Sequence, residues 1–489
     1  MSLLALSNEL LLEIISDLEG STTSISRCTR QLHEIAEPVL YASVNLNHPK
    51  SYTRFIQTIV RNPCLAGYVK HFRTVGHPYG WDFDLSFLTV EDRVWIRSQF
   101  PNSIHDKPTC DAWFKKMFLS SDTNWFDVPK FWDTITAFFL TLFAPRLQTV
   151  RIDSYGWNVD RYQYIDMVLN SASKLSDSFR DLKKVTLMAC TRGDYSIGPS
   201  PLPVHLLISY LQVPSVIQFK ASNVSLVRNP TTTAFHIKDL TLSGCRLTGS
   251  SLTSFLLCFR SLRRLKFYDA APDHTILAAS NLCRGLANST ATLEELILVH
   301  APGESDSWPG EHSSTNDEES GFDVSDGADT EGPRTNVLGS LRSFLTLKTL
   351  HIESAFLLAF DMGRRAPQTV SEPGYHVNER DRVALADCFP ASLEQLTLNI
   401  SPRLHCYVLQ ILSQGIFLNN TPSFKSLHLL FRHHIGNDKP IKPVVGRLEE
   451  LRDLAKVNGV ELSWDCLCQL SMPFQCYEEY ENNWKNQVS

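Results

Sequence analysis

Charged residues between the leucines of short L-x-x-L-x-L segments are the side chains of this sequence best placed to bind a partner. Side chains alternate along a strand, so a charged residue between two buried leucines faces away from the core. The earlier segments carry basic residues and the later ones acidic residues, which would orient a charged protein and speed its encounter. An ordinary solvated face would carry the same charges, so both interpretations stay open. The candidate binding residues are Lys184, Arg263, Arg264, Lys266, Glu295 and Glu353.

Catalytic motifs, by contrast, are incomplete in this sequence. The segment His33–Glu37 starts like the H-E-x-x-H zinc motif but ends in Glu, so the second histidine ligand is missing. The segment Gly193–Gly198 is one residue longer than the G-x-S-x-G nucleophile turn. Buried structural cysteines explain the remaining cluster better than zinc, because its spacing matches no common site. That cluster contains Cys466, Cys468, Cys476, His433 and His434. We therefore expect no enzyme activity, no metal and no cofactor.

The charged candidates depend on a series of predicted strands for their position. Ile237 to Leu247 reads IKDLTLSGCRL and fits the leucine-rich-repeat phrase L-x-x-L-x-L-x-x-N/C-x-L. Nine segments share the L-x-x-L-x-L core, and one such unit cannot bury its apolar face without neighbours. Only two of the eight steps between them fall in the regular range of about 20–29 residues. We predict an α/β fold, an irregular leucine-rich-repeat horseshoe (a solenoid), over residues 147–432. The segments begin at Leu147, Leu182, Val216, Ile237, Leu262, Leu293, Leu347, Leu393 and Phe424.

Residues 1–46 are predicted to form a small all-α unit ahead of the repeats. Leu6, Leu10, Ile14 and Leu18 recur at intervals of four, which indicates a helix with one apolar face. Ser7 or Asn8 can cap its start. A second helix carries Ile25, Cys28, Leu32 and Ile35 at helical spacing and is expected to end at Pro38.

These N-terminal residues resemble the F-box, a helical motif of about forty residues that precedes the repeats of ubiquitin-ligase substrate receptors. The matching segments are LSNELLLEIISDL, the Cys28–Leu32 helix and IAEPVLY at 35–41, although Ser7 stands where the motif usually has proline. The resemblance implies that the motif binds a Skp-type adaptor of a cullin–RING ligase and that the repeats bind an unknown protein substrate. The implied adaptor-binding residues are Leu6, Leu10, Leu11, Ile14, Leu18, Leu32 and Pro38. The alternative is a leucine-rich-repeat scaffold whose N-terminal helices are only a cap.

Three further segments complete the predicted organisation. Residues 47–146 carry a linker helix, a first strand near Tyr68–Phe72 and an aromatic-rich helical insert. A buried insert is the simpler interpretation, and a tryptophan-rich recognition surface is the alternative. Residues 302–335 have few bulky apolar side chains and many acidic ones, which predicts a disordered insert within the repeats. Residues 433–489 supply a helix and a strand that would cap the last repeat.

The composition places the chain among ordinary proteins of a reducing compartment. Its net charge of −6 is local, because residues 303–333 hold ten Asp or Glu and no Lys or Arg. Neither half is basic enough to indicate nucleic-acid binding. The twelve cysteines are scattered rather than grouped as a disulfide framework. No apolar stretch reaches the roughly 18 residues needed to cross a bilayer, and no secretion signal is visible. We expect a cytoplasmic or nuclear protein with no membrane contact.

Overall fold

The computed structural model describes most of the predicted strands and helices. The described residues are 6–18, 22–76, 88–99, 128–154, 163–172, 179–189, 202–225, 234–245, 249–269, 279–300, 340–354, 388–400, 405–414, 421–433 and 442–468. Twelve strands form one sheet, with helices packed against it. Two compact units divide the chain, Met1–Asn223 and Val224–Ser489. Among the described helices, none combines the length and the apolar character that a membrane span requires.

The first unit begins with helices and continues as a parallel sheet. Its helices are α1 (Asn8–Asp17), α2 (Thr22–Ser26), α3 (Arg30–Ala42), α4 (Pro49–Arg61), α5 (Val90–Ser98), α7 (Val128–Phe143), α8 (Gln163–Ala172) and α9 (Val204–Leu211), with a 3-10 turn at Pro63–Tyr68. Its strands are β1 (Ser43–Leu46), β2 (His71–Gly76), β3 (Thr149–Ser154), β4 (Lys184–Ala189), β5 (Leu202–Pro203) and β6 (Gln218–Ser222). Strands β1, β2, β3, β4 and β6 pair in that order, and every one of these pairings is parallel.

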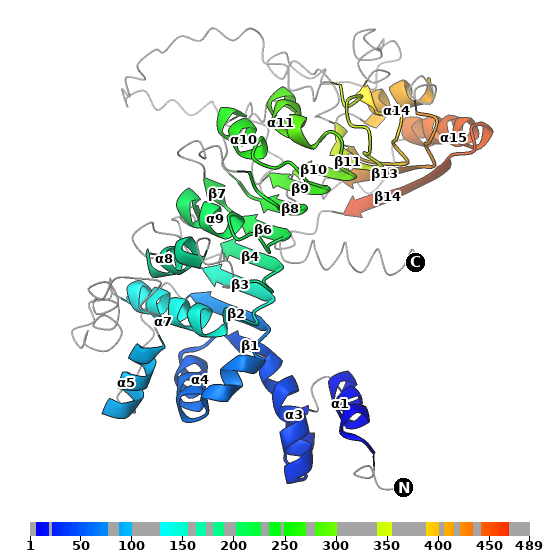
Figure 1. Ribbon diagram of the computed structural model, residues 1–489. Coiled ribbons are helices and arrows are strands. Elements are labelled where there is room, and N and C mark those ends of the chain that lie inside the picture. The colour runs from blue at the N-terminus through cyan, green and yellow to red at the C-terminus, as the bar shows by residue number, and fades with distance from the viewer. Residues whose placement is uncertain are drawn as a thin grey trace, which may run out of the picture. The chain divides into compact units, whose positions relative to one another are not determined.

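Four helices of the first unit, α4, α7, α8 and α9, lie on one side of its sheet (Figure 1). Helix α4 is the predicted linker helix, and it buries Tyr52, Phe55, Ile56 and Ile59. Phe55 packs against Phe139 of α7 with ring centroids 5.3 Å apart. Trp132, Phe138 and Phe143 of the aromatic-rich insert are buried, whereas Val90 and Val94 of α5 are exposed. The helical spacing that predicts a buried insert, at residues 113–118, lies outside the described residues. Trp81, Trp113 and Trp125 lie outside the described residues.

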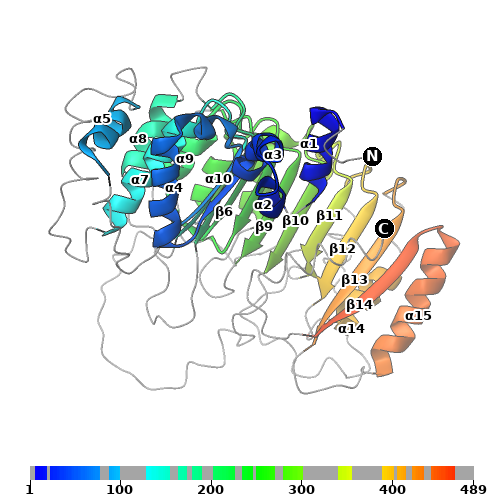
Figure 2. The same cartoon turned by 90° about the horizontal axis from the view of Figure 1, so that it is seen from below.

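The second unit repeats the same arrangement of strand and helix. Its strands are β7 (Val224–Ser225), β8 (Asp239–Ser243), β9 (Arg264–Asp269), β10 (Glu295–His300), β11 (Thr349–Glu353), β12 (Gln395–Ile400), β13 (Ser426–His433) and β14 (Glu461–Cys468). Its helices are α10 (Gly249–Leu256), α11 (Ala279–Gly285), α14 (His405–Ser413) and α15 (Lys442–Val457), with a 3-10 turn at Leu286–Ser289. Strands β8 to β14 pair in sequence order, all parallel, and α15 runs beside β14 in Figure 2.

Every one of the nine L-x-x-L-x-L segments forms a strand, but the predicted horseshoe is wrong. The described strands join a single all-parallel sheet of an α/β fold rather than a distinct solenoid. Alternating leucines report only that one face of a strand is buried. A parallel sheet with helices on one face also buries every second residue of its strands, so the phrase specifies the strand and not the larger architecture.

The predicted separate all-α unit at the N-terminus is also wrong. Helix α3 ends at Ala42 and β1 starts at Ser43, so the helices run straight into the sheet. Residues 1–46 fall within the compact unit Met1–Asn223. Pro38 does not end the second helix, because α3 continues through it to Ala42. Thr29 caps α3, and this cap divides the predicted second helix into α2 and α3.

The C-terminal elements have the predicted types. Helix α15 buries Leu448, Leu451 and Ala455, and Arg452 lies 4.5 Å from the ring centre of Trp464 in β14. Cys245 and Cys258 are buried and form no disulfide. The predicted disordered insert at 302–335 lies outside the described residues, as do Cys190 and Cys476.

Candidate functional site

Helix α1 divides its apolar residues between two faces. Ser7 caps the helix, since its hydroxyl oxygen accepts a hydrogen bond from the backbone N–H of Leu10 at 3.5 Å. Leu11 and Ile15 are 1% and 2% exposed and pack with Leu32 and Ala36 of α3. This cluster holds α1 against α3 and fixes which face of α1 points to solvent.

The solvent face of α1 carries an apolar row that the rest of the described chain leaves open. Leu10, Ile14 and Leu18 are 48%, 37% and 41% exposed, and they follow each other at intervals of four residues. Residues four apart lie on the same side of a helix, so the three side chains form a stripe. We call these three residues the α1 stripe. Leu12 is also 40% exposed, but it lies about 200° around the helix from Leu10.

The structure separates the residues that the F-box resemblance implies into two groups. Leu10, Ile14 and Leu18 are available to a partner, whereas Leu11 and Leu32 are buried inside the helical cluster. Leu6 is partly buried against the same cluster, and Pro38 is half-buried within α3. The periodicity of the sequence gives one apolar face but does not tell which leucines the neighbouring helix covers.

The charged candidates on the sheet mostly pair with one another across neighbouring strands. Arg264 of β9 contacts Asp239 of β8 at 2.5 Å, and Lys266 lies 3.6 Å from Glu295 of β10. Arg263 lies 3.9 Å from Glu294. The guanidinium pKa of Arg264 is raised, first by its hydrogen bond to Asp239. These pairs neutralise much of the charge on the face of β8–β10.

The two remaining charged candidates lie in different surroundings. Glu353 is only 5% exposed, at the end of β11, so it does not contribute to an open charged surface. Lys184 is exposed at the start of β4, in register with Thr149 of β3. The structure therefore brings Arg263, Arg264, Lys266 and Glu295 together in the second unit and leaves Lys184 in the first.

A charged cluster in the first unit escaped the sequence interpretation. Asp153 of β3 has a side chain only 2% exposed, and it pairs with Arg73 of β2 at 2.7 Å and with Arg151 at 2.8 Å. The alternation of side chains that directs Lys184 away from the core also places Arg73, Arg151 and Asp153 on the same face of the sheet. In the sequence, Arg151 and Asp153 alternate with Val150 and Ile152, and this alternation indicates that both charged residues face outward.

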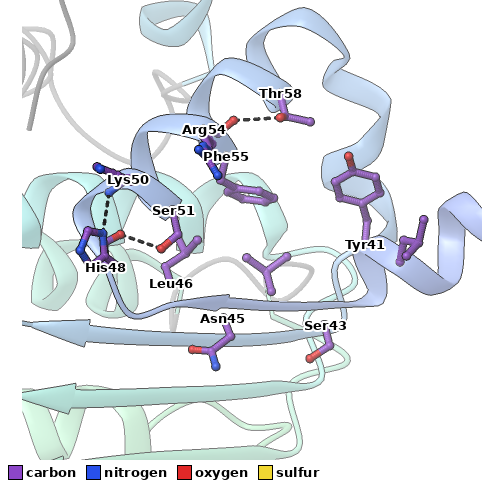
Figure 3. A pocket seen from close by; sticks show the side chains of 12 residues that line it. Tyr41, Ser43, Asn45, Leu46, His48, Lys50, Ser51, Arg54, Phe55 and Thr58 are labelled. Atoms are coloured by element: carbon purple, nitrogen blue, oxygen red, sulfur yellow. Dashed lines mark hydrogen bonds between the residues drawn. The ribbon is translucent and has the colours of Figure 1, made fainter. Parts of the chain in front are cut away.

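An open groove lies beside β1, the first strand of the sheet. It has a volume of about 500 Å³ and is bounded by the end of α3, by β1 and by the first turns of α4. Figure 3 shows Leu46 and Phe55 directed into the space between β1 and α4, while Ser43 and Asn45 point away from α4. His48, Lys50 and Arg54 line it, and its lining residues include no carboxylate. His48 also caps α4, since its Nδ1 accepts a hydrogen bond from the backbone N–H of Lys50 at 3.2 Å.

The described residues show no cluster of side chains that could hold a metal ion. Within them, no three His, Cys, Asp or Glu side chains come together as a metal site would require. His33 and Glu37 are 3.9 Å apart on α3. No protein-family model matches this sequence, and no curated protein matches it. The surfaces described above are therefore the basis on which a function is proposed.

Proposed function

We propose that this chain is a substrate-receptor subunit of an SCF-type cullin–RING ubiquitin ligase. In this proposal the α1 stripe binds a Skp-type adaptor, and the open face of the sheet binds a protein substrate. Other subunits would carry out ubiquitin transfer, and this chain would act by positioning the substrate. A protein-interaction scaffold, whose N-terminal helices only cover the first strand, is the competing function.

The observation that carries the proposal is the exposure of the α1 stripe. An exposed leucine is common, but three large apolar residues in one row on a helix held firmly by its other face suit docking to a partner. These residues fall within the LSNELLLEIISDL segment that resembles the F-box. Fully burying an exposed side chain of this size is worth roughly 1.5–3 kcal/mol. Because the three side chains are 37–48% exposed, the row contributes part of the free energy of an adaptor interface.

The test compares two leucines on opposite faces of α1. Leu10→Asp places a charge in the stripe, and Leu12→Asp makes the same change at a similarly exposed position outside it. We expect Leu10→Asp to weaken binding of a purified Skp-type adaptor by at least about tenfold, a cost of about 1.4 kcal/mol. Leu12→Asp should bind like the parent chain.

Isothermal titration calorimetry on the full chain gives the affinities, and circular dichroism shows that both variants fold. Failure of the parent chain to bind the adaptor would reject the ligase function and favour the scaffold. Equal binding by Leu10→Asp and the parent would show that the adaptor contacts another surface.

A further inference from the structure

The open face of the sheet in the unit Met1–Asn223 gathers positive charge near the beginnings of its strands. Helices α4, α7, α8 and α9 lie on the other side of this sheet (Figure 1). Buried residues of β2 and β3 alternate with residues that face away from those helices. Across the strands these outward residues align, so that Arg73 lies opposite Arg151, and His71 lies opposite Thr149.

Two of these outward residues form a pre-organised pair of guanidinium groups. Both Nε atoms donate to Asp153, with Arg73 Nε 2.9 Å from Oδ2 and Arg151 Nε 2.8 Å from Oδ1. The Asp153 side chain is 2% exposed, but those of Arg73 and Arg151 are 42% and 40% exposed. One buried carboxylate therefore orients two cations and neutralises only one of them. The remaining guanidinium edges are free to bind a further carboxylate.

Three lysines extend this charge along the same part of the sheet. Lys70, Lys183 and Lys184 are exposed, and none has a carboxylate partner among the described residues. Lys70 directly precedes β2, and Lys183 directly precedes β4. The backbone carbonyl of Lys70 accepts a hydrogen bond from the N–H of Gln148, and the N–H of Lys183 donates to the carbonyl of Gln148. The pKa of His71 is lowered by burial and by the charge of Lys70, as expected in a positive environment.

We propose that this surface binds an acidic, extended segment of a partner protein. We define the basic face as Lys70, Arg73, Arg151, Lys183 and Lys184. Among the described residues, the carboxylate that forms ion pairs with these five side chains is that of Asp153. Neighbouring strands lie about 4.8 Å apart, and same-side residues of an extended segment lie about 6.6 Å apart. Charges spread at this scale match a series of separate carboxylates.

The chemistry of the basic face favours carboxylates of a protein over the phosphates of a nucleic acid. Single strands bind where aromatic side chains accept stacked bases. The outward residues described on β2, β3 and the start of β4 include His71 but no Phe, Tyr or Trp. In the second unit the corresponding cations Arg264 and Lys266 are already paired with carboxylates. The proposal rests on the basic face alone and is separate from adaptor binding by α1.

The test uses a labelled peptide of about five Glu-Thr repeats, which presents every glutamate on one side when extended. Fluorescence anisotropy with the full chain measures its affinity at about 0.05 M and about 0.3 M salt. The (Gln-Thr) peptide of equal length is the uncharged control. A single-stranded oligonucleotide of equal formal charge tests the nucleic-acid alternative.

The decisive variant is Lys183→Glu with Lys184→Glu, because these exposed side chains support no described ion pair. We expect this variant to bind the (Glu-Thr) peptide at least about tenfold more weakly at low salt, with a smaller loss at high salt. The matched control is Arg61→Glu with Lys456→Glu, which changes the net charge equally at the ends of α4 and α15. The control should bind the peptide like the parent.

Four results would overturn the proposal. They are equal binding of the (Gln-Thr) peptide, equal loss in the control variant, tighter binding of the oligonucleotide, and unchanged binding after reversal of the two lysines. Adaptor binding measured on the same variants keeps the two proposals distinct. The lysine variant should retain the adaptor, and Leu10→Asp should retain the acidic peptide.

Discussion

At the residue scale, a buried hydroxyl group joins three elements of the first unit. The Tyr52 hydroxyl contacts Thr74 Oγ1 and accepts a hydrogen bond from Trp132 Nε1 at 2.8 Å. Burial raises the pKa of Tyr52 above its ordinary value, so the hydroxyl keeps its proton. The group is therefore a permanent donor as well as an acceptor between α4, β2 and α7.

Removing this hydroxyl with Tyr52→Phe should lower the free energy of unfolding by about 1–2 kcal/mol, because two buried partners each lose a hydrogen bond. Urea denaturation of the full chain measures the change. Tyr41→Phe is the matched control, since Tyr41 is only partly buried and the same atom is removed. An equal effect in both variants would show that the Tyr52 network adds no stability.

A second residue-scale prediction concerns His428 of β13. Its Nδ1 lies 2.8 Å from Ser463 Oγ, and burial lowers its pKa below 6.5 while Asp465 opposes the shift. The unfolded chain therefore binds a proton at higher pH than the folded chain. The contribution of His428 to stability is present above pH 6.5 and is lost as pH falls below it.

His428→Gln should consequently reduce the loss of stability between about pH 7.5 and about pH 5.5. Denaturation at several pH values measures this slope, with His236→Gln as a control at an exposed position. A steeper slope in His428→Gln than in the parent would contradict the sign of the shift.

At the element scale, α7 supplies a cap to the helix that follows it. Asp133 of α7 is 1% exposed, and its Oδ1 accepts a hydrogen bond from the backbone N–H of Ile165 at 3.0 Å. Ile165 lies in the first turn of α8, where backbone N–H groups have no partner within the helix. The side chain of one helix thus satisfies the start of the next.

Asp133→Ala should therefore lower the free energy of unfolding by about 1–3 kcal/mol, because a buried donor is left without its partner. Asp453→Ala, at an exposed position of α15, should change it by less than about 0.5 kcal/mol. Hydrogen exchange adds a local measurement, since α8 should lose protection before the strands do. Unchanged exchange in α8 would reject the capping role.

The elements also show how far the sequence can be interpreted without a structure. Alternating leucines place all nine predicted strands, and the four apolar residues of α4 place that helix. The same patterns miss β1, because the alternation of Ser43–Leu46 covers only four residues. They also take α2 and α3 as one helix, since helical spacing persists across the Thr29 cap. Local periodicity reports burial, whereas caps and strand order depend on tertiary contacts.

The candidate surfaces also depend on tertiary contacts that the sequence does not show. The sequence locates the apolar residues of α1, but only the packing of Leu11 and Ile15 on α3 shows that Leu10 faces outward. It locates Arg264 and Glu295, but it does not show that each has a charged neighbour on the adjoining strand. Pairing across strands depends on the register between them. That register brings together residues 25 positions apart in the chain, such as Asp239 and Arg264.

At the scale of the whole molecule, the long connection between β10 and β11 accounts for the net negative charge of the chain, with ten of its 52 acidic residues. The two strands pair in register, with Glu295 opposite Thr349, so the ends of the connection are held by the sheet. Residues 303–333 within it contain ten Asp or Glu and no Lys or Arg. Replacing residues 304–332 with a short Gly-Ser linker would therefore turn a net charge of −6 into a net positive charge.

This replacement should leave the melting temperature within about two degrees of the parent, because halving a loop changes its closure free energy by only about 0.6 kcal/mol. Association of the (Glu-Thr) peptide should become faster at low salt, because long-range repulsion between acidic groups is removed. A third chain, with residues 304–332 replaced by a shuffled sequence of identical composition, separates charge from specific packing. It should match the parent in both measurements. A fall of several degrees in the linker and shuffled chains alike would show that this connection packs against the folded protein through its own sequence.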